Sequence, residues 1–281
     1  MKTLVTGGKG QLGYDVLKNL RMLGKDCVGA DIDDFDITDS AATESFLEAS
    51  RPDAVIHCSA YTAVDRAEEQ PELCRSVNVD GTRNLAETCK KMGAKMVLIS
   101  TDYVFDGSGT KPHEVDDPKN PLNLYGRSKL DAEETVKAIL PRHFIVRTSW
   151  MFGKNGNNFV KTMLRLGSKN DEINVVCDEV GSPTYTSDLA PLICSMTETE
   201  KFGTYHATNE GFCSWADFAS EIFRQAGLSA TVNPVPTSAY SAAAKRPLNS
   251  RLSKSCLDEA GFHRLPSWQD ALHRYLQEIK E

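Results

Sequence analysis

Three glycines, Gly7, Gly10 and Gly13, stand between a short apolar run at the start of the chain and a longer amphipathic stretch. A G-x-x-G-x-x-G spacing lets the backbone turn tightly and brings the start of a helix close to the preceding strand. Backbone N–H groups at such a helix start form a site for a pyrophosphate. The spacing therefore predicts a β-strand over residues 2–6, a helix over residues 11–23 and a dinucleotide site between them.

The same alternation of short β-branched runs and longer amphipathic stretches continues to about residue 150. It predicts an α/β fold with a Rossmann-like doubly wound parallel sheet. The runs are almost entirely apolar, as expected of strands that helices cover on both faces. The predicted strands are residues 2–6, 27–30, 54–58, 96–100 and 144–148, and the predicted helices are residues 11–23, 40–49, 74–92 and 125–139.

Beyond residue 150 the pattern is less regular and predicts a smaller C-terminal α/β region. We expect residues 1–150 to form an NAD(P)-binding domain and residues 151–281 to form mainly a substrate-binding region, with some segments returning to the first domain. The proline-rich stretch 234–251 is predicted to be a loop that closes over a ligand. The predicted helices here are residues 159–166, 187–196, 215–226 and 268–279, and the predicted strands are residues 173–176 and 204–207.

Composition narrows the choice of partners. The 281 residues carry a formal net charge of −7 and no long run of Lys and Arg, which argues against a nucleic-acid partner. No apolar run approaches the roughly 18 residues of a membrane helix and no secretory signal precedes the first strand, so we expect a cytoplasmic protein without a membrane contact. The eight cysteines are scattered and share no C-x-x-C spacing, so reduced core thiols are expected and no metal site is predicted.

An acidic residue, Asp31, stands at the end of the second predicted strand, where a carboxylate can accept hydrogen bonds from the adenosine ribose. This position favours NADH over NADPH, although Asp31 also fits a solvated acid in a loop that holds several more. Asp36 and Ile37 are placed to contact the adenine, and the segment after the third strand is placed to border the pyrophosphate. The predicted cofactor contacts are Gly7, Gly10, Gln11, Leu12, Gly13, Asp31, Asp36, Ile37, Ala60, Tyr61, Thr62, Tyr125 and Lys129.

Tyr125 and Lys129 form a Tyr-x-x-x-Lys motif at the start of a predicted helix, and the i, i+4 spacing places both on one face. A neighbouring ammonium lowers the pKa of a phenol, which prepares Tyr125 to donate a proton to a carbonyl oxygen. Thr101, at the end of the fourth predicted strand, is placed to polarise the same carbonyl. Ser100 is the alternative, because it also lies at this strand end but closer to the buried register.

Together with the glycine loop, residues 57–68, 100–105 and 147–150 resemble the dTDP-4-dehydrorhamnose reductases, a family of extended short-chain dehydrogenases. The likeness continues through residues 156–164, 181–184, 236–240 and 246–252. It implies NADH- or NADPH-dependent reduction of the 4-keto group of dTDP-6-deoxy-L-lyxo-4-hexulose to dTDP-L-rhamnose. It also implies that Thr101, Tyr125 and Lys129 are catalytic, and that substrate is bound by Thr101, Asp102, Trp150, Asn158, Arg246 and Arg251.

In physical terms, Trp150 offers a flat apolar wall to a sugar ring, and the two arginines offer charge-assisted hydrogen bonds to a diphosphate. Either arginine also fits a helix cap or an ion pair with a surface acid. His57 and the pair Met151-Phe152 depart from the family pattern, and we expect His57 to be buried and neutral. Two other functions fit the same motifs: a nucleotide-sugar epimerase or dehydratase, and a non-catalytic NAD(P)-binding regulatory subunit like that of methionine adenosyltransferase. The residues leave the oligomeric state open, a homodimer included.

Overall fold

A six-stranded, fully parallel sheet forms the centre of the computed structural model, which describes residues 1–280. Its strand order, β10-β5-β4-β3-β1-β2, reverses direction between β1 and β3. This reversal opens a crevice at the carboxyl ends of the strands, where ligands bind in sheets of this type. The strands are β1 (Thr3–Thr6), β2 (Cys27–Ala30), β3 (Ala54–His57), β4 (Lys95–Thr101), β5 (His143–Thr148) and β10 (Gly203–His206).

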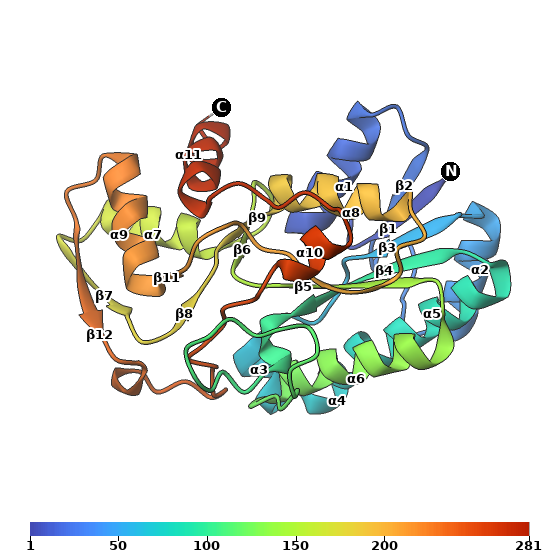
Figure 1. Cartoon of the computed structure of the whole chain (residues 1–281), viewed down its shortest axis with the longest axis horizontal. Coiled ribbons are helices and arrows are strands. Elements are labelled where there is room, and N and C mark those ends of the chain that lie inside the picture. Colours follow the sequence, from blue (N-terminus) through green and yellow to red (C-terminus); the bar gives the residue numbers. More distant parts are fainter. Residues whose placement is uncertain (281) are drawn as a thin grey trace.

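Helices cover both faces of the sheet, which confirms the predicted fold class (Figure 1). One face packs against α1 (Gln11–Met22) and α8 (Thr186–Thr197), and the other against α2 (Ser40–Ser50), α5 (Gly81–Met92) and α6 (Leu124–Ile139). Each helix turns a stripe of apolar side chains toward the strands. The result is two apolar layers that hold the sheet between them.

The sixth strand, β10, comes from the second half of the chain and pairs with β5. The five strands predicted before residue 150 are all present, but they do not complete the sheet. α8, the helix before β10, also packs against the first half, beside α1. Residues 186–206 therefore return to the first half of the chain (Figure 1).

The predicted helix over residues 74–92 is wrong as one continuous α-helix. The structure has α3 (Val64–Glu69), α4 (Pro71–Arg75), a π-helical turn (Ser76–Asp80) and then α5. The wider π turn carries Asn78, whose side chain accepts from the N–H of Tyr61 at 2.8 Å and donates to its carbonyl oxygen at 3.1 Å. π turns are common at functional sites, and this one fixes the segment that follows β3.

The second half of the chain forms a smaller body around aromatic side chains of α7 (Phe159–Gly167), α9 (Trp215–Ala226) and α11 (Trp268–Glu278). β7 (Glu172–Val176) and β12 (Thr231–Val235) pair in parallel along one side, so the predicted loop 234–251 begins inside a strand. The remaining short elements are β6 (Met151–Phe152), β8 (Val180–Gly181), β9 (Thr184–Tyr185), β11 (Cys213–Ser214), α10 (Ser255–Glu259) and 3-10 turns at Asp102–Val104 and Thr237–Ala239.

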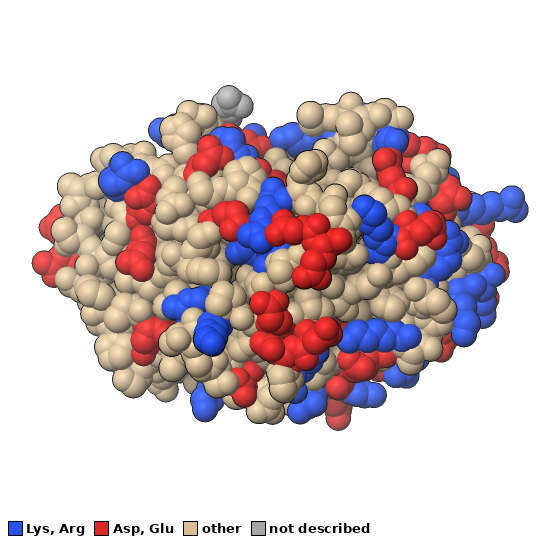
Figure 2. Space-filling view, in the orientation of Figure 1, with Lys and Arg blue, Asp and Glu red and all other residues tan. Residues whose placement is uncertain are grey.

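The surface in Figure 2 carries acidic and basic side chains interspersed with one another, without a continuous basic band on the face shown. None of the helices in residues 1–280 has the length and apolar character needed to span a membrane.

A buried ion pair joins α6 to the sheet. The Arg147 guanidinium, on β5, donates to Glu133 of α6 at 2.9 and 2.7 Å, and the Ser100 hydroxyl donates to the same carboxylate at 2.6 Å. Burial raises the pKa of Glu133, but the hydrogen bond and charge of Arg147 outweigh it and hold the pKa below its usual value. Glu133 and Arg147 therefore remain a charged pair inside the protein.

Replacement of Glu133 by Gln should lower the free energy of unfolding by about 3–5 kcal/mol, because it leaves the Arg147 charge buried without a counter-ion. Urea unfolding followed by circular dichroism measures the change. Glu134→Gln is the matched control on the same helix, since its side chain is 62% exposed and its loss should cost under about 0.5 kcal/mol. Equal effects of the two substitutions would show that the buried pair has no special role.

Candidate active site

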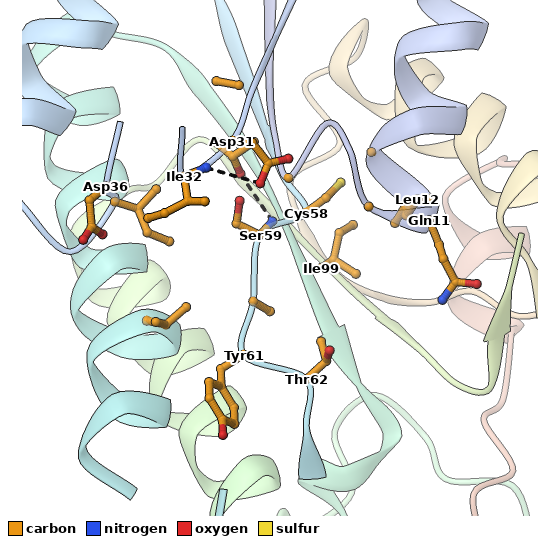
Figure 3. A pocket seen from close by; sticks show the side chains of 18 of the residues that line it. Gln11, Leu12, Asp31, Ile32, Asp36, Cys58, Ser59, Tyr61, Thr62 and Ile99 are labelled. Carbon is orange, nitrogen blue, oxygen red and sulfur yellow. Dashed lines mark hydrogen bonds between the residues drawn. The ribbon is translucent and has the colours of Figure 1, made fainter. Parts of the chain in front are cut away.

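A cavity of about 480 Å³ lies in the crevice between β1 and β3 (Figure 3). Every cofactor residue predicted outside the catalytic helix lines it, namely Gly7, Gly10, Gln11, Leu12, Gly13, Asp31, Asp36, Ile37, Ala60, Tyr61 and Thr62. The sequence analysis did not select several apolar lining residues, among them Phe35, Ile99 and Met151. No sequence motif marks these residues. An apolar residue at a strand end gives the same sequence pattern whether its side chain faces the core or a ligand.

The glycine loop leaves room for a ligand only because it lacks side chains. Gly7 has φ +67°, and a Cβ on it would lie 2.8 Å from the backbone nitrogen of Ser59. A Cβ on Gly13 would collide with the carbonyl oxygen of Gly7. α1 begins after Gly10, which has no side chain to cap it, so the N–H groups of its first turn face the cavity. This cradle fits the pyrophosphate of a dinucleotide.

The Asp31 carboxylate lies at the rim of this cavity, where it accepts from the N–H of Lys9 at 2.9 Å and from the N–H of Ile32 at 3.2 Å (Figure 3). A basic residue, Lys9, lies close to Asp31. The Lys9 ammonium lies 2.5 Å from Asp33, so the loop brings a cation beside the acidic cluster. The Asp36 carboxylate instead accepts from the N–H and hydroxyl of Thr38, both at 2.8 Å.

Thr101 and Tyr125 lie together at the end of β4. Interaction with the Thr101 hydroxyl favours the ionised Tyr125 phenol, but burial dominates and raises the pKa of Tyr125 above its ordinary value. The expectation that Lys129 lowers this pKa is not met. Thr101 also donates to Asp102 at 3.0 Å, whereas Ser100 is bound to Glu133. The geometry thus brings Thr101, and not Ser100, to the phenol.

Lys129 is buried one turn further along α6, and burial lowers its pKa to about 8 against the opposing influence of Glu133 and Cys58. Cys58 lines the cofactor cavity, so the Lys129 side chain reaches toward that cavity. His57 is buried between the hydroxyls of Thr6, at 2.7 Å, and Thr82, at 3.1 Å. Burial and the Lys129 charge lower the pKa of His57 to about 3, which confirms a buried, neutral histidine.

Asp102 is a buried carboxyl directly beside this cluster. Burial raises its pKa to about 6, and hydrogen bonds with Ser250 and Thr101 only partly oppose that rise. Its Oδ2 atom is buried without a hydrogen-bond partner. An unsatisfied buried polar atom next to a phenol of perturbed pKa is typical of a functional site.

A second cavity, of about 650 Å³, lies between α3 and the smaller body. Its walls include Tyr103, whose ring meets that of Tyr125 edge-on at 5.8 Å, and Arg246. The sequence analysis missed Tyr103, Glu179 and Trp215 as lining residues. Glu179 is buried and accepts from the indole N–H of Trp215 at 3.1 Å. Only the fold brings these segments together, so no local pattern could have identified them.

Of the six predicted substrate contacts, only Arg246 lines the second cavity. Thr101 and Asp102 lie beside Tyr125, and Trp150, Asn158 and Arg251 have other contacts. Trp150 has a left-handed backbone, φ +48°, and its ring stacks on Trp215 at 3.7 Å, so Trp215 presents the wall to the second cavity. Asn158 caps α7 and donates to Gln11 and Tyr275, so its side chain is fully used within the protein. Arg251 donates to Asn249 at 2.8 Å and does not line the cavity with Arg246.

Tyr125 and Lys129 line neither cavity. Tyr125 contacts Tyr103 of the second cavity edge-on, and Lys129 lies near Cys58 of the first cavity. The two residues of the motif therefore lie beside walls of different cavities.

The whole chain, residues 1–281, matches the protein family described as RmlD substrate binding domain. A dTDP-4-dehydrorhamnose reductase from Streptomyces griseus is 41% identical over 276 residues, which cover 96% of this chain and 91% of the relative. The crystal structure of a dTDP-4-dehydrorhamnose reductase from Clostridium acetobutylicum is 42% identical, covers 100% of both chains and has a TM-score of 0.98.

The dTDP-4-dehydrorhamnose reductase from Bacillus anthracis, solved in complex with NADP, is 42% identical over 99% of both chains, with a TM-score of 0.96. The match extends over both halves of the chain. The chain belongs to the dTDP-4-dehydrorhamnose reductase family.

Proposed function

We propose that the protein reduces the 4-keto group of dTDP-6-deoxy-L-lyxo-4-hexulose to give dTDP-L-rhamnose, with NADH or NADPH as the reductant. The observation that carries this proposal is the place of Tyr125, which lies beside Thr101 and contacts Tyr103 of the second cavity, while Lys129 on the same helix lies near Cys58 of the cavity with the pyrophosphate cradle. The family supports the same reaction.

The nicotinamide cofactor supplies a hydride to the keto carbon. Tyr125 donates a proton to the carbonyl oxygen, which becomes the new hydroxyl, and Thr101 orients that oxygen by hydrogen bonding. The Lys129 ammonium faces the cofactor side, where it donates hydrogen bonds to the nicotinamide ribose and so positions the cofactor for the same reaction. Asp102, whose carboxyl keeps one oxygen without a partner, is placed to hold a sugar hydroxyl.

Residues 1–150 are proposed to hold the cofactor and residues 151–281 mainly the dTDP sugar. Arg246 supplies the charge for the diphosphate, and Trp215 takes the role of apolar wall that was predicted for Trp150. A cytoplasmic location fits the eight cysteines, which are all unpaired.

The direct test is the stoichiometry of the reaction with purified protein. NAD(P)H oxidation, followed by nicotinamide absorbance, should equal dTDP-L-rhamnose formed. An epimerase or dehydratase would return the hydride to the sugar and consume no cofactor. A regulatory subunit would bind cofactor and turn over no keto sugar.

Replacement of Tyr125 by Phe should lower turnover at least about 100-fold while cofactor binding survives, because only the proton donor is lost. Lys129→Met should lower turnover and also weaken cofactor binding. The double substitution should cost less than the product of the two single losses, since both residues serve the same reaction. Single-turnover rates of the four proteins measure this, and a Tyr125→Phe protein of near wild-type rate would exclude the mechanism.

The pH profile of kcat/KM should fall as pH rises through about 8, because the lowered pKa of Lys129 makes it lose its proton there. Below that pH the ammonium is present and activity is retained. Lys129→Arg keeps the charge to about pH 12, so its profile should lack this alkaline limb. A wild-type profile that stays level to about pH 10 would contradict a catalytic ammonium at this position.

NADH should support at least the rate that NADPH supports, because the Asp31 carboxylate repels a 2′-phosphate and Asp33 already neutralises Lys9. Asp31→Asn should raise the NADPH rate relative to the NADH rate about fivefold, as expected for one unit charge a few ångströms away. Initial rates with both cofactors test this. A strong preference of the wild type for NADPH would show that Lys9 controls the site.

A further inference from the structure

The loop from Thr237 to Arg246, called the strap below, runs from the end of β12 toward α3 (Figure 1). Thr237, residues 240–243 and Arg246 line the second cavity. At one end Asp178 accepts from the N–H and the hydroxyl of Thr237, at 2.8 and 2.6 Å. Tyr240 donates to the carbonyl oxygen of Asn174 at 2.7 Å. These contacts hold the first part of the strap to the smaller body.

Two side chains hold the other end of the strap: Asn123 donates to the carbonyl oxygen of Lys245 at 2.8 Å, and Asp65 of α3 contributes a carboxylate. Asp65 accepts from the N–H of Ala244 at 3.1 Å and from both terminal nitrogens of Arg246, at 3.2 and 2.7 Å. The side chain of Asp65 is 48% exposed and that of Arg246 is 26% exposed. The pair therefore lies at the rim of the cavity, within reach of solvent and of an incoming ligand.

The charged side chains that line the second cavity do not, in their present pairing, favour the binding of a diphosphate. Among the described residues that line it, the charged ones are Asp65, Glu179 and Arg246, which is two carboxylates against one guanidinium. The single cation is already paired in a two-nitrogen contact with Asp65. A diphosphate offers the same planar guanidinium a stronger partner, since it carries more charge and more acceptor oxygens.

We propose that Asp65 holds Arg246 until the diphosphate of the substrate takes its place, and that Asp65 thereby lowers the affinity for ligands whose diphosphate enters the second cavity. This inference rests on the proposed function. It assigns a role to Asp65, which is not one of the proposed proton-transfer groups. Because the product carries the same diphosphate, Asp65 also helps to displace the product, as its carboxylate returns to Arg246. Ligand selectivity thus depends on an exchange of partners at one guanidinium.

Asp65→Asn tests the exchange, because Asn keeps an acceptor for Ala244 and removes the competing charge. Isothermal titration of the full chain should give a Kd for dTDP about fivefold lower in this variant, the size expected for a partly exposed ion pair. Thymidine, which has no phosphate, should bind both proteins equally. Glu69→Gln, which removes an exposed charge from the same helix, should change the dTDP affinity less than about twofold.

A double-mutant cycle separates partner exchange from a general charge effect. Arg246→Gln should weaken dTDP binding, and Asp65→Asn should bring no tightening in that background. Unchanged or weaker dTDP binding by Asp65→Asn alone would overturn the inference, as would equal tightening with and without Arg246. Failure of the wild type to bind dTDP would refute the proposed function itself, and the inference with it.

Discussion

The buried pair of Glu133 and Arg147 joins the strand and the helix that carry Thr101, Tyr125 and Lys129. Ser100 is bound to the pair and is followed in the chain by Thr101, while Glu133 lies one helical turn after Lys129. The distance between β4 and the catalytic helix is therefore governed by ionic hydrogen bonds of defined length. Burial of two charges away from water lowers the stability of the fold. A pair of apolar side chains at the same place would often lower it less. What the pair provides here is a fixed register between strand and helix.

Two sites for phosphate-bearing ligands occur in a chain whose formal net charge is −7. The first site meets negative charge with backbone N–H groups of α1 and with the absence of side chains at Gly7 and Gly13. The second relies on the guanidinium of Arg246. The backbone N–H groups and the guanidinium both act over a few ångströms. The net negative charge of the chain therefore does not prevent phosphate binding at either site. Neither site calls for a basic surface.

The part of the structure that the sequence predicts well is the part whose signals are local. The glycine loop, the strand rhythm and the Tyr125 motif each depend on residues a few positions apart, and the fold class and the lining of the first cavity follow from them. The second cavity depends on contacts between distant segments. Trp150 was chosen for its chemistry, but its left-handed backbone turns the ring onto Trp215, and nothing near it in the sequence marks this.

The pKa of Tyr125 shows a similar limit. The i, i+4 spacing indicates that Lys129 shares its helix face, but not how deeply either side chain is buried. Burial turns out to be the larger influence and raises the phenol pKa, while it lowers that of the lysine. Desolvation is a property of the packed protein, so a motif alone gives only one of the opposing contributions.

The origin of β10 has a consequence for synthesis of the chain on the ribosome. When the first 150 residues have emerged, β5 is the last strand of the sheet, and its outer backbone groups have no neighbour until Gly203–His206 follows. An unpaired edge strand is a template for contact with other chains. The nascent protein must therefore pass through an interval, of about fifty further residues at roughly 5–20 residues per second, in which this edge is open to association.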